Sequence, residues 1–80
     1  MKTITELEWR RLFSERVRHY MQLYDINQKE LAESIGVTEA AISRYLSYER
    51  TPRIDVIVSL ASVFACTTDE LIMFGYVVMG

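Results

Sequence analysis

The sequence predicts an all-α fold, a bundle of five helices in one domain of 80 residues. Apolar residues recur three and four positions apart through most of the chain, which is the helical period. Threonine or asparagine, residues that cap helices well, precedes four of the expected helices. Residues 27–53 have the pattern of two short helices joined by a tight turn, and the other helices are expected to pack on this unit.

The first helix is expected from about Leu7 to Tyr24. Thr5 and Glu8 have the spacing of a capping box, in which each side chain binds the other residue's backbone amide. Apolar residues follow at helical spacing: Trp9, Leu12, Phe13, Val17, Tyr20, Met21 and Tyr24. Trp9 is either a core residue or an exposed contact, and the core is favoured. Four arginines on this helix are expected to be solvated and paired with nearby glutamates rather than bound to phosphate: Arg10, Arg11, Arg16 and Arg18.

The second and third helices form the central unit. Asn27 and Glu30 make a second capping box, so the second helix begins at Gln28. Gly36 suits the positive φ that commonly ends a helix, and Thr38 caps the third helix. The inward side of the pair is apolar: Leu31, Ala32, Ile35, Ile42, Tyr45 and Leu46. The outward side of the third helix is polar and free to meet a partner: Glu39, Ala40, Ser43, Arg44 and Ser47.

Pro52 sets the start of a fourth helix that has too many apolar residues for one stripe, so we expect it to be buried on more than one side. Thr67 and Glu70 form another capping box and open a short fifth helix that ends near Gly75. Cys66 is expected to be a small core residue. We divide the chain into a domain at 1–75 and an apolar tail at 76–80, which is expected to contact a second subunit.

Composition narrows the classes of function. There is no apolar run of about 18 residues that would make a membrane helix, and the single cysteine allows no internal disulfide, so a cytoplasmic protein is expected. The single histidine has no carboxylate pair or thiol arranged around it, and no glycine-rich phosphate loop is present. We therefore expect no catalytic residue, metal, cofactor or small-molecule ligand.

Charge is distributed unevenly along the chain. The net charge is −2, which by itself argues against nucleic acid. All nine Lys and Arg, however, lie at or before Arg53 together with eight Asp and Glu, which leaves +1, and the remainder carries only three acidic residues. Such an asymmetry can turn one face towards DNA.

The residues from Leu31 to Tyr45 carry a family resemblance. The pattern L-A-x-x-x-G-V-T-x-x-x-I-S-R-Y, followed by R-T-P, resembles the helix-turn-helix of the Cro/C1 phage repressors, or XRE family, and the likeness extends over about residues 12–74. It implies a phage-repressor-like bundle and a small, bacterial or phage-encoded transcriptional regulator that binds double-stranded DNA, with repression as the favoured role.

Two departures from the family pattern affect the third helix. Many members join the first and third helices through a buried Arg–Glu pair, whose positions correspond to Met21 and Leu46 here. Both are apolar, so we predict that they touch, since an ion pair can be exchanged for packed apolar groups. The family's Asn-Gly-Lys loop is replaced by Ser47-Tyr48-Glu49. Because tyrosine disfavours positive φ, either the third helix runs on or the loop forms another turn.

The third helix, at about 39–46, is the expected reading element in the major groove. Its candidate base-facing residues are Glu39, Ala40, Ser43 and Arg44, of which Arg44 is the first candidate for specificity because it can bind guanine O6 and N7. Glu39 either accepts from a cytosine amino group or only supports the helix start while bonded to Gln28. Candidate phosphate contacts are Gln28, implied by the resemblance, and Lys29, Thr38, Ser47, Arg50 and Arg53.

A homodimer would place two reading helices about 34 Å apart and select a near-palindromic operator. The alternative function is a protein-interaction module on a helix-turn-helix scaffold, such as an antitoxin or an adaptor. Weak basicity, Glu39, Glu49 and the apolar tail favour that alternative, and salt-sensitive binding of duplex DNA would favour the regulator.

Overall fold

The computed structural model describes residues 4–72, and every regular element in that range is a helix. The helices are α1 (Glu6–Leu23), α2 (Gln28–Ile35), α3 (Glu39–Leu46), α4 (Ile54–Val63) and α5 (Thr68–Ile72). The all-α fold with five helices is thus confirmed. The expected end of the fifth helix near Gly75 and the tail at 76–80 lie outside the described residues.

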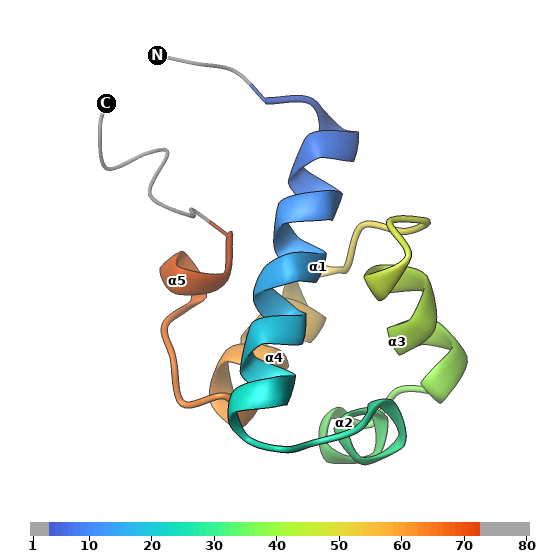
Figure 1. The fold of residues 1–80 in the computed structure, drawn as a ribbon, viewed down its shortest axis with the longest axis vertical. Helices are drawn as coiled ribbons and strands as arrows, with labels where there is room; N and C mark the ends of the chain where they lie inside the picture. The colour runs from blue at the N-terminus through green and yellow to red at the C-terminus, as the bar shows by residue number, and fades with distance from the viewer. Residues whose placement is uncertain (1–3, 73–80) are drawn as a thin grey trace.

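The other four helices are arranged around α1, which runs along the long axis of the molecule (Figure 1). It packs against α3 on one side and α5 on the other, while α4 lies behind it and packs on α2 and α5. α2 and α3 also pack on each other, so the helix-turn-helix is held by α1 and α4 together. α3 consequently lies at the side of the molecule, with only its inner face covered.

Each helix contributes to a single apolar core. Its fully buried large side chains are Phe13, Leu31, Ile42, Leu60, Phe64 and Leu71. The inward faces expected for α2 and α3 are confirmed, with Ile35 only partly buried. Trp9 is partly buried: it stacks on Phe13 with ring centroids 4.9 Å apart, and its Nε1 donates to the Ile72 carbonyl at 3.1 Å.

Cys66 and Met21 are both partly buried against this core. Burial raises the pKa of the Cys66 thiol above its ordinary value, which disfavours the reactive thiolate and agrees with a packing role. The predicted contact of Met21 with Leu46 stays a prediction, since what the structure shows is that Leu46 belongs to the core and Met21 packs against that core.

One expectation about α4 is wrong. Val56, Ile57, Leu60 and Ala61 are buried on one broad face, but Ile54 and Val58 are 68% and 52% exposed. α4 packs mainly on α2 and α5. The side of α4 that faces away from these two helices is left uncovered in the described chain. A surplus of apolar residues on α4 therefore lies at the surface.

The first four helices end in the same backbone motif, with a left-handed residue just after the last turn. These residues are Asp25, Gly36, Tyr48 and Ala65, with φ of 52°, 74°, 67° and 53°. In each case the next amide closes the motif on a carbonyl five residues earlier, for example Val37 N on Ala32 O at 3.0 Å and Cys66 N on Ala61 O at 3.0 Å. Only one of the four positions has glycine.

Exchange of glycine and alanine at two of these helix ends should have opposite effects on stability. Gly36→Ala should lower the free energy of unfolding by about 1 kcal/mol, because a left-handed conformation is costly for any residue with a Cβ. A Cβ at Gly36 would meet nothing within 4 Å, so the cost is conformational and not steric. Ala65→Gly should raise the same free energy by roughly 0.5–1 kcal/mol. Urea unfolding of the two variants checks this, and changes of the same sign would contradict it.

Candidate nucleic-acid interface

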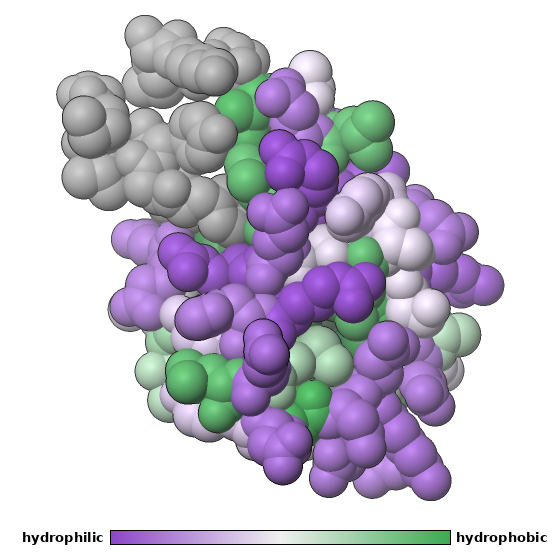
Figure 2. All heavy atoms as spheres, viewed as in Figure 1, coloured by the Kyte–Doolittle hydropathy of each residue, from purple (hydrophilic) through white to green (hydrophobic). Residues whose placement is uncertain are grey.

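The outward face of α3 is an exposed polar surface. Residues 39, 40, 43 and 44 are all exposed, whereas Ile42, Tyr45 and Leu46 are buried. At 100° per residue these four positions lie on one side of the helix. The structure therefore brings together the four predicted base-facing residues, Glu39, Ala40, Ser43 and Arg44, on one face. Figure 2 shows that the surface over α1, α2 and α3 is largely hydrophilic from this side.

The start of each helix in the helix-turn-helix is capped as the sequence predicts. Asn27 Oδ1 accepts from Glu30 N at 2.8 Å, and Glu30 Oε1 accepts from Asn27 N at 3.0 Å. Thr38 Oγ1 accepts from Ala41 N at 3.1 Å. These caps leave the first amides of α2, those of Gln28 and Lys29, at the positive end of the helix dipole, where an anion is favoured.

The basic side chains near this face are accessible. Arg44, Arg50 and Lys29 are exposed and take part in no ion pair within residues 4–72. Arg53 Nε lies 3.5 Å from Asp55 Oδ1, but these side chains are 85% and 68% exposed, and such a surface pair is easily exchanged for another anion. Glu39 makes no hydrogen bond to Gln28 in the described chain. The alternative that Glu39 only supports the start of α3 while bonded to Gln28 therefore has no support from the structure.

The loop after α3 departs from both sequence-based alternatives. α3 ends at Leu46, and Tyr48 itself takes the left-handed conformation with φ of 67°, so the expectation that tyrosine avoids it is wrong. Two contacts offset the conformational cost. Glu49 N donates to Arg44 O at 2.9 Å, which closes the helix end, and Arg10 Nη1 donates to Tyr48 O at 3.3 Å.

Ser47, predicted to contact a phosphate, has a partner inside the loop. Its hydroxyl donates to the Glu49 carboxylate and lies 3.4 Å from the Arg44 carbonyl oxygen. Glu49 is thereby folded back onto the end of α3. A phosphate would have to displace this carboxylate to reach the Ser47 hydroxyl.

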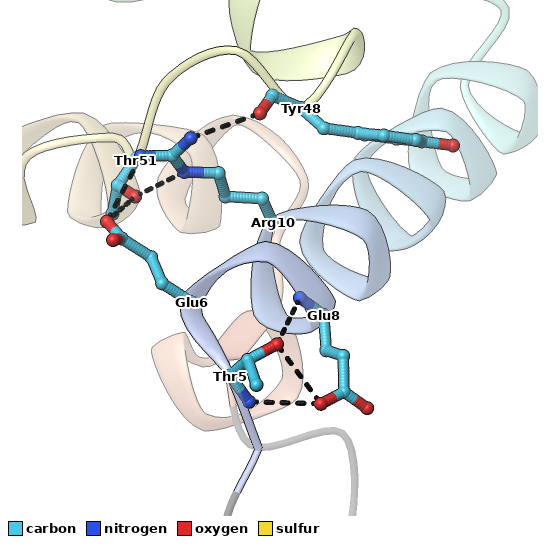
Figure 3. Close-up of polar contacts among 6 residues, drawn as sticks. All are labelled: Thr5, Glu6, Glu8, Arg10, Tyr48 and Thr51. Atoms are coloured by element: carbon cyan, nitrogen blue, oxygen red, sulfur yellow. Dashed lines mark hydrogen bonds and ion pairs between the residues drawn. The ribbon is translucent and has the colours of Figure 1, made fainter.

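Figure 3 shows how α1 holds the same loop. Arg10 Nε donates to Thr51 Oγ1 at 2.8 Å, and Thr51 Oγ1 donates to Glu6 Oε2 at 2.6 Å. Arg10 Nη2 also pairs with Glu6 Oε2 at 3.2 Å. The loop from α3 to α4 is thus fastened to the first turns of α1 by side chains that sequence reasoning did not connect.

The arginines of α1 are only partly as expected. Arg10 pairs with Glu6, and Arg11 pairs with Glu15 at 3.0 Å, as predicted for helix neighbours. Arg16 Nε instead donates to the Glu70 carbonyl at 3.1 Å, and Arg18 Nη2 donates to the Leu46 carbonyl at 3.1 Å. Together with Arg10, which donates to the Tyr48 carbonyl, three of the four therefore bind backbone carbonyls of other segments.

The exposed polar face of α3, the capped helix starts and the turn at Gly36 agree with the sequence comparison. A helix-turn-helix family model, HTH_3, matches residues 17–71, more than half of the chain. The protein belongs to the HTH_3 family. This confirms the resemblance to the Cro/C1-type regulators, which are helix-turn-helix proteins that bind double-stranded DNA. No curated protein sequence matches the chain.

Three of the solved structures similar to this HTH_3 protein are named as a transcriptional repressor, a transcriptional regulator and a hypothetical transcription factor. The SOS-response transcriptional repressor LexA from Eubacterium rectale is 28% identical, with a TM-score of 0.76 over 81% of this chain and 69% of that one. An HTH_3 family transcriptional regulator from Vibrio cholerae is 15% identical, with a TM-score of 0.76 over 84% of this chain and 38% of that one. The hypothetical transcription factor NHTF from Neisseria is 17% identical, with a TM-score of 0.77 over 90% and 83%. The latter two support the fold alone.

The described part of this HTH_3 protein offers neither a metal site nor a membrane-spanning helix. Residues 4–72 contain no group of three or more His, Cys, Asp or Glu side chains arranged to hold a metal ion. None of their helices is both long and apolar enough to cross a membrane.

The contact between Thr51 and Glu6 should be visible in a titration. The hydrogen bond from the Thr51 hydroxyl, and then the charge of Arg10, hold the pKa of the Glu6 carboxyl below its usual value. A carboxyl whose pKa is lower in the folded state stabilises the fold above its unfolded pKa, and this contribution is lost as the pH falls through the folded pKa. Thr51→Val should therefore raise the pKa of Glu6 towards its usual value, as followed by carboxyl carbon NMR. An unchanged pKa in this variant would show that the hydroxyl does not act on Glu6.

Proposed function

We propose that the protein binds double-stranded DNA sequence-specifically as a small transcriptional regulator, with repression as the favoured role. The observation that carries this proposal is the exposed face of α3, where Glu39, Ala40 and Ser43 project beside the Arg44 guanidinium, which forms no ion pair within residues 4–72, from a helix whose other side is buried. A helix of this kind fits the major groove, where base edges present a distinct pattern for each pair.

Within this proposal α3 reads bases through three kinds of contact. Arg44 donates two hydrogen bonds to guanine, Glu39 accepts from a cytosine amino group, and Ala40 contacts a thymine methyl. Ser43 reaches a base or a phosphate. The exposure of these side chains and the lack of an ion pair on Arg44 within residues 4–72 support the assignment.

Phosphate contacts would orient the protein without specifying sequence. The proposed donors are Gln28, Lys29, Thr38, Ser47, Arg50 and Arg53. Three of them are cations: Lys29, Arg50 and Arg53. Each phosphate that a cation neutralises contributes about −0.9 to the slope of log affinity against log salt concentration. A slope of roughly −2.7 per protomer is therefore expected if all three engage. The Ser47 contact requires the Glu49 carboxylate to move.

The active form we propose is a homodimer on a near-palindromic operator, with half-sites one helical turn apart. A cytoplasmic location, for a protein encoded by a bacterium or a phage, fits this function, and the proposal involves no small-molecule ligand or cofactor. The titration that tests the proposal uses fluorescence anisotropy of duplexes from DNA flanking the gene, at two salt concentrations. We expect binding that weakens steeply with salt, and affinity that does not change with salt would contradict the proposal.

The second candidate is a module that binds another protein, such as an antitoxin or adaptor. Ile54 and Val58, exposed four residues apart on α4, favour it, because exposed apolar groups on one helix side suit a protein contact. The two candidates differ in outcome: a stable complex with a protein partner and no binding of any duplex would support the module and overturn the regulator.

A further inference from the structure

Three hydrogen-bond donors on α1 stand four residues apart and lie on one side of that helix: Arg10, Ser14 and Arg18. We name them the donor row. Arg10 Nη1 donates to Tyr48 O at 3.3 Å, Ser14 Oγ to Leu46 O at 2.8 Å, and Arg18 Nη2 to Leu46 O at 3.1 Å. All three thus donate to backbone carbonyls at the C-terminal end of α3 or, for Arg10, in the loop two residues beyond it.

The carbonyl of Leu46 needs partners from outside its own helix. The last four carbonyls of an α-helix have no intrahelical donor. In α3 three of them are satisfied locally: Ser43 O by Ser47 N at 3.0 Å, Tyr45 O by Tyr48 N at 3.4 Å and Arg44 O by Glu49 N at 2.9 Å. The fourth, Leu46 O, receives both of its hydrogen bonds from the donor row.

Ser14 lies where a hydroxyl is costly without a partner. Its exposure is 0%, and among the described residues it is the only buried polar side chain. A buried hydroxyl left without a hydrogen bond costs about 1–3 kcal/mol, as a general magnitude for such groups. The hydroxyl of this buried serine therefore depends on one acceptor, the Leu46 carbonyl at the end of α3.

Arg18 adds a charge at the same place. The C-terminal end of a helix carries partial negative charge, so a guanidinium there is attracted both by the carbonyl and by the dipole. Hydrogen bonds are directional, whereas apolar contacts between helices are not. Apolar packing holds α1 and α3 together, and the donor row selects one rotation and one axial position of α3 among those that packing tolerates.

We propose that the donor row positions the reading face of α3, with Arg10, Ser14 and Arg18 acting as positioning residues that do not touch DNA. This inference rests on the proposed function, because it concerns how Arg44 and its neighbours are aimed. Arg44 is the residue whose own carbonyl closes the helix end. A rotation of α3 about its axis would therefore displace its side chain together with the loop that Arg10 holds.

The variants that test this are Arg18→Met, which keeps the aliphatic stem and removes the donor, and Arg18→Lys, which restores a charged donor. Arg11→Met is the matched control, because Arg11 is on the same helix but pairs with Glu15. Ser14→Ala is a further variant. If this core substitution fails to fold, Arg18→Met and Arg18→Lys still test the proposal. Thermal unfolding first establishes that each variant is folded.

Hydrogen exchange of the free protein gives a readout without DNA. In Arg18→Met the amides of residues 45–49 should exchange several-fold faster while those of α2 are unchanged, and Arg18→Lys should recover part of the protection. Exchange in Arg18→Met that equals exchange in Arg11→Met would overturn the proposal. This result is independent of whether the wild-type protein binds DNA at all, so failure of the proposed function is recognised separately.

Affinity for a duplex obtained by selection from random sequence gives the second readout. Arg18→Met should bind it roughly tenfold more weakly, as expected when one charge-assisted hydrogen bond no longer aims the helix. Its salt slope should equal that of wild type. A slope reduced by about 0.9 would show that Arg18 binds a phosphate, and an unchanged affinity would show that the row does not aim α3; either result would overturn the proposal.

Discussion

Replacement of Arg44 by alanine should relax the preference of the protein at one base position. A bidentate arginine contact to guanine discriminates against the wrong base by about 1–3 kcal/mol, which corresponds to a loss of roughly 5- to 150-fold in selectivity at that position. Arg44 is exposed on the outward side of α3, so its truncation should leave the core and the free energy of unfolding nearly unchanged. Selection of binding sites from random duplexes, with wild type and variant in parallel, measures the effect.

Arg50→Ala is the matched control for this experiment. Arg50 is exposed in the loop after α3 and is proposed as a phosphate contact, so its loss should weaken binding to all sequences alike and lower the salt slope by about 0.9. The two arginines differ in assigned role and not in charge. Uniform losses across all sequences for both variants would rule out the assignment of Arg44 as a reader.

Leu46→Glu should unfold the protein or come close to doing so. Leu46 is 2% exposed, and an unpaired carboxylate at such a site costs about 3–5 kcal/mol when no partner is supplied. A domain of 80 residues has little stability to lose, since small domains bury a modest share of their surface. Chemical denaturation followed by circular dichroism would show the loss.

The double variant Met21→Arg with Leu46→Glu should recover much of that stability. It restores the buried ion pair that the family resemblance implies at these two positions, and the two substitutions should couple because the side chains are predicted to touch. Met21→Arg alone is the remaining corner of the cycle. Additive effects of the two substitutions would show that Met21 and Leu46 are not in contact and would remove that prediction.

Features that depend on a few neighbouring residues were predictable from the sequence. The capping boxes at Thr5 with Glu8 and at Asn27 with Glu30 involve residues three apart, so their chemistry is visible without knowledge of the fold. The same holds for Gly36 at the turn and for the inward and outward sides of α3, which follow from the period of the helix.

Features that depend on backbone acceptors were not predictable. Ser14 and Arg18 both donate to the backbone carbonyl oxygen of Leu46. Because every residue has such a carbonyl, no pattern of side chains in the sequence predicts which one is the acceptor. Tyr48 at positive φ is a related case: its conformation is stabilised by Glu49 N on Arg44 O and by Arg10, not by the tyrosine itself. The exposure of Ile54 depends on which helices pack against α4, which composition does not specify.

The amide map of the protein on DNA tests the central claim most directly. Nitrogen–proton NMR spectra of labelled protein, recorded with and without a duplex from site selection, report which backbone amides sense the DNA. We expect the largest shifts at residues 28–30, 38–47 and 50, with small shifts over α4. Shifts centred on α4, or none at residues 39–44, would show that the exposed side of α3 does not face the double helix.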